Sequence, residues 1–298
     1  MGKTAQCIIC HSKTKSRKKY NPRSLNSLFK HNIKRFLLDP FSQIKKIGRK
    51  PVFGGYVIVC DNCGHGMLEH PPTKSVLQDY YRDQYWSDRF VDTIDKIDLE
   101  KEPRANAQMD VVCNFVNCHD INNVLEIGAG SAKASLLIQK RYGNKPQLHV
   151  CEPSSKWVDY YNHFGIRKIA DYFPYGDSEN FIFDYIHTSH WLEHVLDLHE
   201  VLINLHQVLA PNGYIFLEVP NTEHFYWDLP TRNDIPHIHF FTRRSLLQAM
   251  NSYDFECLSI EEYGITFAEA QQGIPLTADR YGLCEQGYWI RGLFRKTR

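Results

Sequence analysis

Two glycines and two acids stand at positions in this chain where their residue types could hold a ligand. Gly128 and Gly130 follow an apolar run that contains Glu126, and Glu152 ends a second apolar run further along. Glycine lets the backbone turn tightly and approach a ligand closely, and a helix over 131–140 would aim its N-terminal amides at the same place. The pattern predicts a pocket for a nucleotide-like ligand at the ends of two strands.

The spacing of these residues separates two classes of ligand. A dinucleotide site of the G-x-G-x-x-G type needs a third glycine where this chain has Lys133. Glu126 would repel a pyrophosphate but attract a positively charged amino-acid group, as in S-adenosylmethionine (SAM). Glu152 stands where an acid meets ribose hydroxyls in doubly wound folds. We therefore predict SAM as the cofactor, held by Glu126, Gly128, Ala129, Gly130, Glu152 and Pro153.

From about Asn106 to Arg298 the chain resembles the class I SAM-dependent methyltransferases, on the glycine run and its two acids. The resemblance implies a Rossmann-like α/β fold with seven strands, in which Asp171 and Tyr172 follow the third strand and contact adenine. The implied strands are Val124–Ile127, Leu148–Cys151, Ile166–Ala170, Tyr185–Thr188, Gly213–Val219, Glu256–Glu262 and Tyr288–Arg295. Independently, the alternation of apolar strands with helical patterns such as 197–209 favours a parallel α/β sheet.

Four of the nine cysteines form two C-x-x-C pairs, Cys7 with Cys10 and Cys60 with Cys63. Two such pairs supply four thiolates for one tetrahedral zinc ion, and a site without an open position would be structural. A redox-active C-x-x-C is the alternative, but neither pair opens a helix after a buried strand as a thioredoxin-like motif would. We predict structural Zn²⁺.

The segment 11–50 between the two pairs contains thirteen Lys or Arg and one acid, a net charge of +12 in a chain of +1. Such an excess attracts phosphates, an anionic membrane surface or nucleic acid. Apolar residues at helical spacing predict a basic amphipathic helix over 24–38, which could contact a partner or a membrane surface. A solvated insertion is the alternative.

The length of 298 residues and the hydrophobic content of 43% predict a sizeable core and two domains. No apolar run approaches membrane-spanning length, and the first residues lack a secretory pattern. We expect a cytoplasmic protein, with the inner face of the membrane as a further place of contact.

The cysteine pairs, the stretch Tyr80–Trp86 and the SAM-type pattern together narrow the resemblance to zinc-module methyltransferases that modify sugars. In that group the tyrosine-rich stretch covers the active site, and a His-x-x-aromatic-Phe-Ser/Thr segment supplies the proton-accepting histidine. The match here is 237–242, which makes His237 the implied base and Tyr85 part of the cover. A glutamate expected before the histidine is replaced by Pro236, so Asp234 or His239 would have to support it.

The sequence from His190 to His194 matches the H-x-x-E-H pattern of inverted zinc proteases. The resemblance instead places a Leu-Glu-His stretch after the fourth strand, so Glu193 and His194 would line the active site and His190 would lie near the cofactor. An alternative is a catalytic divalent ion on Glu193 and His194.

The predicted organisation has three parts: a zinc-binding module over 1–75, a cover over 76–105 and the methyltransferase domain over 106–298. We predict O-methylation of a sugar hydroxyl, on a nucleotide-sugar, glycolipid or surface polysaccharide that could carry phosphate. The group's sugar C-methyltransferases have a further C-terminal domain, whereas this sequence stops after its final implied strand. This difference favours O-methylation here. The alternatives are an RNA methyltransferase that binds the nucleic-acid backbone through the module, and a scaffold without activity.

Overall fold

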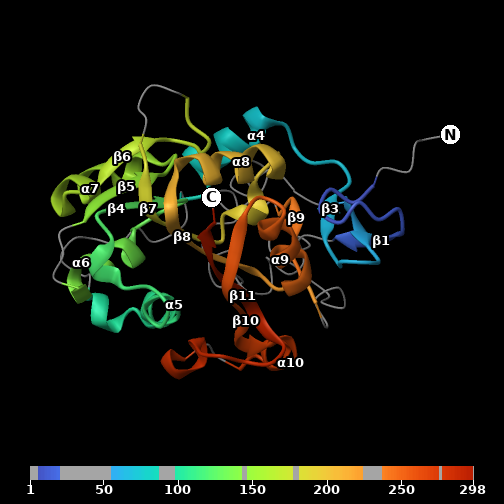
Figure 1. The fold of residues 1–298 in the computed structure, drawn as a ribbon. Coiled ribbons are helices and arrows are strands. Elements are labelled where there is room, and N and C mark those ends of the chain that lie inside the picture. Colours follow the sequence, from blue (N-terminus) through green and yellow to red (C-terminus); the bar gives the residue numbers. More distant parts are fainter. Residues whose placement is uncertain are drawn as a thin grey trace, which may run out of the picture.

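The structure, a computed structural model, describes residues 6–20, 55–86, 98–142, 146–176, 181–223, 237–274 and 277–297. Among these residues the strands form one sheet of seven and one of four. Helices cover both faces of the large sheet, and the small sheet lies to one side of it (Figure 1). The predicted fold class, a Rossmann-like α/β sheet with a small N-terminal module, is confirmed.

The large sheet has the order β10-β11-β8-β7-β4-β5-β6. The five strands from β8 to β6 are parallel, while β11 pairs antiparallel with both β8 and β10. The chain first proceeds outward from β4 to β6 and then returns to β7 on the other side of β4. Such a switch point opens a crevice at the carboxyl ends of the strands. The strands are β4 (Asn123–Ile127), β5 (Gln147–Cys151), β6 (Arg167–Ala170), β7 (Phe183–Ser189), β8 (Leu209–Pro220), β10 (Phe255–Thr266) and β11 (Gly287–Lys296).

Alternation along β4 separates the two faces of this sheet. Val124 packs with residues of α5, α6 and α7, whereas Leu125 and Ile127 pack with α8 and α9. Successive side chains of a strand point to opposite faces, so an apolar strand can build two cores. Glu126 therefore lies on the α6 face. The helices are α5 (Pro103–Cys113), α6 (Lys133–Tyr142), α7 (Val158–Phe164), α8 (Leu198–Val208) and α9 (Arg243–Asn251).

The small sheet has the order β1-β2-β3-β9, and its last strand comes from far along the chain. β3 pairs antiparallel with β9 at Gly66 opposite Phe240 and at Met67 opposite His239. Tyr20, Phe240 and their neighbours form a core of their own between the sheets. The N-terminal module is therefore joined to the segment after residue 236 by backbone pairing. Its strands are β1 (Lys15–Tyr20), β2 (Gly55–Cys60), β3 (Gly66–Leu68) and β9 (His239–Phe240).

The implied strands appear at the expected places, but β8 begins at Leu209 instead of Gly213 and β10 ends at Thr266 instead of Glu262. Leu209 pairs with Phe183, and the register then jumps to Tyr185 opposite Tyr214. This register shift lies within β8, where Asn212 has a φ of 61°. The predicted helix over 131–140 begins at Lys133 instead. Shorter elements are α4 (Lys74–Asp79), η1 (Tyr80–Gln84), η3 (Leu99–Lys101), η4 (Cys118–Asp120), η5 (Ser155–Trp157), η6 (Leu192–His194), α10 (Phe267–Gln271) and η8 (Ala278–Tyr281).

Several predictions fall outside the described residues. The basic amphipathic helix over 24–38 lies there entirely, and of the basic segment 11–50 only its first ten residues are described, mostly as β1. Asp234 and Pro236 are also outside. In the part of the chain that the structure describes, no helix is both long and apolar enough to cross a membrane.

Candidate cofactor and active site

The glycine loop after β4 has the backbone conformation that the sequence predicts. Gly128 and Gly130 have φ angles of 67° and 50°, in the left-handed region that favours glycine. A Cβ atom on Gly128 would lie 3.1 Å from the Trp191 ring. The amide of Gly128 donates to the carbonyl of Cys151, at 2.9 Å, which fixes the loop beside the end of β5. Ala129, between the two glycines, is buried.

Glu126 connects this loop to the helix that follows it. Its carboxylate accepts hydrogen bonds from the amide of Ser135 at 3.0 Å and from the Ser135 hydroxyl at 2.5 Å. The position is favourable for a carboxylate because the N-terminus of α6 carries partial positive charge. Burial nevertheless raises the pKa of Glu126 to about 7. Its contact with the amino group of a cofactor stays a prediction. In the structure the Glu126 carboxylate is hydrogen-bonded to Ser135 of α6.

Glu152 lies buried at the carboxyl end of β5 with both oxygens engaged. Oε2 accepts from the amide of Gly130 at 3.0 Å, and Oε1 accepts from the amide of Ser154 at 3.0 Å. The indole Nε1 of Trp86 also donates to Oε1, at 3.3 Å. Burial raises the pKa of Glu152, while these hydrogen bonds oppose that shift. Two of the predicted cofactor residues, Gly130 and Glu152, are thus in direct contact.

Two further predicted cofactor residues follow β6. Asp171 is half exposed and pairs with Lys168 at 2.7 Å, and the Tyr172 hydroxyl donates to the Gln78 carbonyl at 2.7 Å. Tyr172 therefore links the edge of the large sheet to α4. Pro153 follows Glu152 directly and is half-buried.

Four charged or titratable side chains converge after β7. Glu193 is 1% exposed, and its Oε1 lies 3.1 Å from Nδ1 of His190 and 3.6 Å from Nε2 of His194. One ligand-type atom from each of Glu193, His194 and His237 lies within 4.8 Å of the others. The rings of His194 and His237 have centroids 5.0 Å apart. The structure thus brings His190, His194 and His237 together around one buried carboxylate.

The electrostatics of this group keep His237 neutral and Glu193 ionised at neutral pH. Burial, together with the nearby His194, lowers the pKa of His237 to about 3, so its imidazole is neutral at neutral pH. Burial opposes ionisation of Glu193, yet the surrounding imidazoles hold its pKa at about 2. A neutral imidazole beside a carboxylate can accept a proton, and the carboxylate then stabilises the imidazolium.

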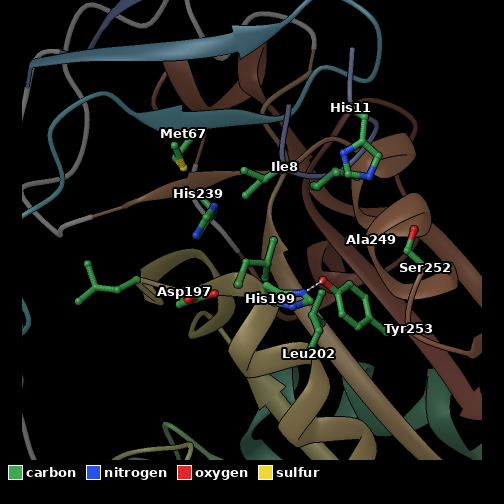
Figure 2. A pocket seen from close by; sticks show the side chains of 13 residues that line it. Ile8, His11, Met67, Asp197, His199, Leu202, His239, Ala249, Ser252 and Tyr253 are labelled. Carbon is green, nitrogen blue, oxygen red and sulfur yellow. Dashed lines mark hydrogen bonds between the residues drawn. The ribbon is translucent and has the colours of Figure 1, made fainter. Parts of the chain in front are cut away.

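His239 lies apart from this group. Its Nδ1 is 3.3 Å from Nε2 of His65, and the two rings stack with centroids 5.3 Å apart. His239 lines a cavity of about 640 Å³ between the N-terminal module and the ends of α8 and α9 (Figure 2). Glu193 and His237 do not line that cavity. The structure therefore does not bring His239 into contact with the predicted base, and among the described residues Glu193 is the acid beside His237.

The tyrosine-rich segment Tyr80–Trp86, here called the strap, packs over these histidines. Tyr80 and Tyr85 belong to one apolar cluster with Ile238, the residue after the predicted base. The ring of Tyr81 lies edge-on to His194, with centroids 5.6 Å apart. The strap ends at Trp86 over Glu152, so one short segment contacts both groups of predicted site residues.

A buried ion-pair network supports the same edge of the sheet, and the sequence analysis missed it. The carboxylate of Glu218 in β8 accepts from Arg291 in β11 at 2.5 Å, from Gln108 at 2.9 Å and from Arg104. The two arginines hold the pKa of Glu218 well below its usual range against the effect of burial. The sequence signal for this network was one charged residue within each of two apolar strands, Glu218 in β8 and Arg291 in β11. The network also reaches His190, whose Nε2 lies 3.6 Å from Glu218.

The four paired cysteines meet in the N-terminal module. The Sγ atoms of Cys7 and Cys63 are 3.6 Å apart, those of Cys10 and Cys60 are 3.5 Å apart, and all four lie within 4.8 Å of one another. Zn–S bonds of about 2.3 Å in a tetrahedron put sulfur atoms about 3.8 Å apart. The hydrogen bond between Cys7 and Cys63 lowers the pKa of Cys7 and raises the pKa of Cys63, so Cys7 is the first of the two to become the thiolate that binds metals. The cluster fits the predicted zinc ion.

The cysteine cluster is tied to the segment that carries the predicted base. The Thr242 hydroxyl donates to the Cys63 carbonyl at 2.7 Å, and the amide of Leu68 in β3 donates to the Ile238 carbonyl at 2.8 Å. From the other side, the amide of Ile238 donates to the Glu193 carbonyl at 2.8 Å. Residues 237–242 are therefore clamped between the module and the loop after β7.

Comparison with known families agrees with this geometry. A family model described as a methyltransferase domain matches residues 79–260, more than half of the chain. The chain belongs to this methyltransferase family. Together with the fold, the family makes the protein a SAM-dependent methyltransferase and SAM its methyl donor.

Solved structures of other methyltransferases share the fold of this one. An S-adenosylmethionine-dependent methyltransferase from Mesorhizobium loti is 14% identical, with a TM-score of 0.51 over 66% of this chain and 100% of that one. A putative methyltransferase from Haloferax volcanii, in complex with the Trm112 methyltransferase activator, is 12% identical with a TM-score of 0.50, over 66% and 91% of the two chains. At these identities the likeness concerns the fold alone. Among curated proteins none matches this methyltransferase significantly.

Proposed function

We propose that this methyltransferase O-methylates a sugar hydroxyl, on a nucleotide-sugar, a glycolipid or a surface polysaccharide, with His237 as the general base. The observation that carries the proposal is the buried group of Glu193, His194 and His237 at the carboxyl edge of the sheet, beneath the strap. The family supplies the methyl donor, and this group supplies what an alcohol acceptor needs. A hydroxyl must lose its proton as its oxygen attacks the methyl carbon.

The proposed cofactor site is the edge formed by the glycine loop and Glu152. SAM supplies an electrophilic methyl group on sulfur. Gly128 and Gly130 let the backbone approach the cofactor, Glu152 accepts hydrogen bonds from its ribose, and Asp171 and Tyr172 lie toward the adenine. The buried Glu152 carboxylate, with backbone donors on both oxygens, is the feature of the structure that fits this role.

In the proposed proton step, Nε2 or Nδ1 of His237 accepts the acceptor's hydroxyl proton while the oxygen forms its bond to the methyl carbon and the carbon–sulfur bond breaks. His237 is neutral at neutral pH because burial lowers its pKa to about 3. The ionised Glu193 stabilises the imidazolium that forms. Tyr81 and Tyr85 of the strap offer aromatic faces against which the apolar face of a sugar ring can pack.

We further propose that the four cysteines bind one structural Zn²⁺ and that this ion fixes the position of His237. The support is the clamp on residues 237–242, which joins Thr242 to the Cys63 carbonyl and β9 to β3. Four thiolates leave no open coordination position, so the role of the ion would be to hold the fold.

The test is to incubate the protein with methyl-labelled SAM and an extract of its native cell, and to separate RNA, protein, polysaccharide with lipid, and small molecules. We expect label in the glycan or sugar-nucleotide fraction, and its loss with His237→Ala. Label in RNA instead would overturn the proposal and assign the basic segment to backbone binding. The control is His199→Ala, a change in the separate cavity of Figure 2.

A further inference from the structure

Trp86 occupies a position on Glu152 that no backbone group fills. Its indole Nε1 donates to Oε1 of Glu152 at 3.3 Å. The other donors to this carboxylate are the amides of Ser154 and Gly130, each at 3.0 Å. Those two amides are fixed by the turn after β5 and by the glycine loop. The indole is the one side-chain donor among these three, and it comes from the strap.

The Trp86 ring also covers the glycine loop. A Cβ atom on Gly130 would lie 3.2 Å from Cζ2 of Trp86, so the ring rests directly on this glycine. The ring meets Trp157 edge-on, with centroids 5.1 Å apart. On the backbone, Nζ of Lys156 donates to the Trp86 carbonyl at 2.8 Å. The indole is thus seated where the loop leaves room for a ligand.

The chemistry of Glu152 explains why a donor is needed there. The carboxylate is 3% exposed, and a buried acceptor that loses a partner without replacement costs free energy. A ribose hydroxyl and an indole N–H are interchangeable as donors to the same oxygen. A ring in contact with Gly130 and a cofactor that approaches the same glycine cannot occupy the same space.

We infer that Trp86 is an intramolecular competitor for the cofactor's ribose position: it satisfies Glu152 in the free protein and leaves when ribose hydroxyls take its place. The inference rests on the cofactor site described under Proposed function. Because Trp86 ends the strap, its departure would move the segment whose Tyr81 ring contacts His194. Binding of the cofactor would thereby change the position of the strap over the proposed acceptor site.

The first test measures the affinity for S-adenosylhomocysteine by calorimetry in the wild type, Trp86→Phe and Trp157→Phe. Trp86→Phe keeps a ring but removes the competing donor, so we expect the dissociation constant to fall about three- to tenfold. Trp157→Phe is the matched control, because the Trp157 N–H is buried without a hydrogen-bond partner in the structure. We expect its affinity to stay within about twofold of the wild type, since no hydrogen bond is removed.

The second test follows the Trp86 indole N–H of the wild-type protein by NMR, and the Trp86→Phe variant serves only to assign its signal. The five tryptophans give five indole N–H signals in a ¹H–¹⁵N spectrum, and the absence of one in Trp86→Phe assigns Trp86. We expect saturating S-adenosylhomocysteine to shift this signal and to speed its exchange with water, because the bond to Glu152 is lost. A Trp86 signal unchanged at saturation would overturn the inference.

The two tests separate this inference from the proposed function. If the wild type binds S-adenosylhomocysteine and Trp86→Phe binds it equally or more weakly, the competitor role is wrong while the cofactor site stands. If Glu152→Ala leaves the affinity for S-adenosylhomocysteine unchanged, both in the wild type and in Trp86→Phe, the assignment of the ribose site itself is wrong.

Discussion

The proposed cofactor side and the proposed acceptor side of this methyltransferase are built in different ways. On the cofactor side, the contacts among Glu126, Gly130, Ser135 and Glu152 join residues less than thirty positions apart. On the acceptor side, Cys63 bonds to Thr242, 179 positions away. The first arrangement is local enough to leave a motif in the sequence. The second depends on a small module that pairs with a distant strand, so its loss should affect catalysis more than cofactor binding.

The largest effect should come from removing the zinc ion proposed for the four-cysteine cluster. Structural zinc contributes on the order of 10 kcal/mol to such modules, so Cys63→Ser or chelation should unfold the N-terminal module and release residues 237–242. We expect about one zinc per chain by metal analysis, loss of methyl transfer, and retained affinity for S-adenosylhomocysteine. The control is Cys284→Ser, a half-buried thiol outside the cluster. Equal loss of cofactor affinity would break the division into two sides.

His237→Ala tests the acceptor side with a single residue. Loss of a general base lowers turnover about 10²- to 10⁴-fold. We expect that loss with S-adenosylhomocysteine affinity unchanged, as measured by labelled methyl transfer and by calorimetry. Normal turnover would move the base to another residue of the group, with His194 next in line.

Glu152→Ala tests the cofactor side. It removes the carboxylate that accepts from Gly130 and Ser154, and a hydrogen bond to a charged group contributes about 1.5–3 kcal/mol. We expect the affinity for S-adenosylhomocysteine to fall at least about tenfold in calorimetry. The control is Glu285→Gln, an exposed acid far from the loop in sequence. Unchanged affinity in Glu152→Ala would show that this acid does not contact the ribose.

The smallest effect concerns stability and pH. Burial raises the pKa of Glu126 to about 7, above its value of about 4.5 in an unfolded chain, so the folded state holds its proton more tightly. Stability should therefore fall as pH rises from about 5 to 7.5, by no more than about 3 kcal/mol. Glu126→Gln should flatten that dependence in denaturant unfolding at several pH values. An unchanged slope would mean that Ser135 keeps the carboxylate ionised throughout.

The expected base and its supporting acid show where sequence reasoning reached its limit. The segment 237–242 was recognisable as a pattern, but the residue expected to support His237 was Asp234 or His239. Asp234 lies outside the described residues; among the described residues Glu193 lies beside His237, because the amide of Ile238 donates to the Glu193 carbonyl. His239 faces His65 across the β3–β9 pairing instead. A neighbour in sequence is a poor guide where two distant segments run side by side.

The sequence by itself determined the α/β sheet, the positions of its strands, the glycine loop with Glu152, and the two cysteine pairs. These features depend on apolar periodicity and on short spacings, which act within one element or one turn. The tertiary structure alone decided which distant polar groups meet: Glu218 with Arg104 and Arg291, Glu193 with His237, and Trp86 with Glu152. Such pairs form only after strands and loops distant in sequence have been packed together, and nothing local in the chain specifies them.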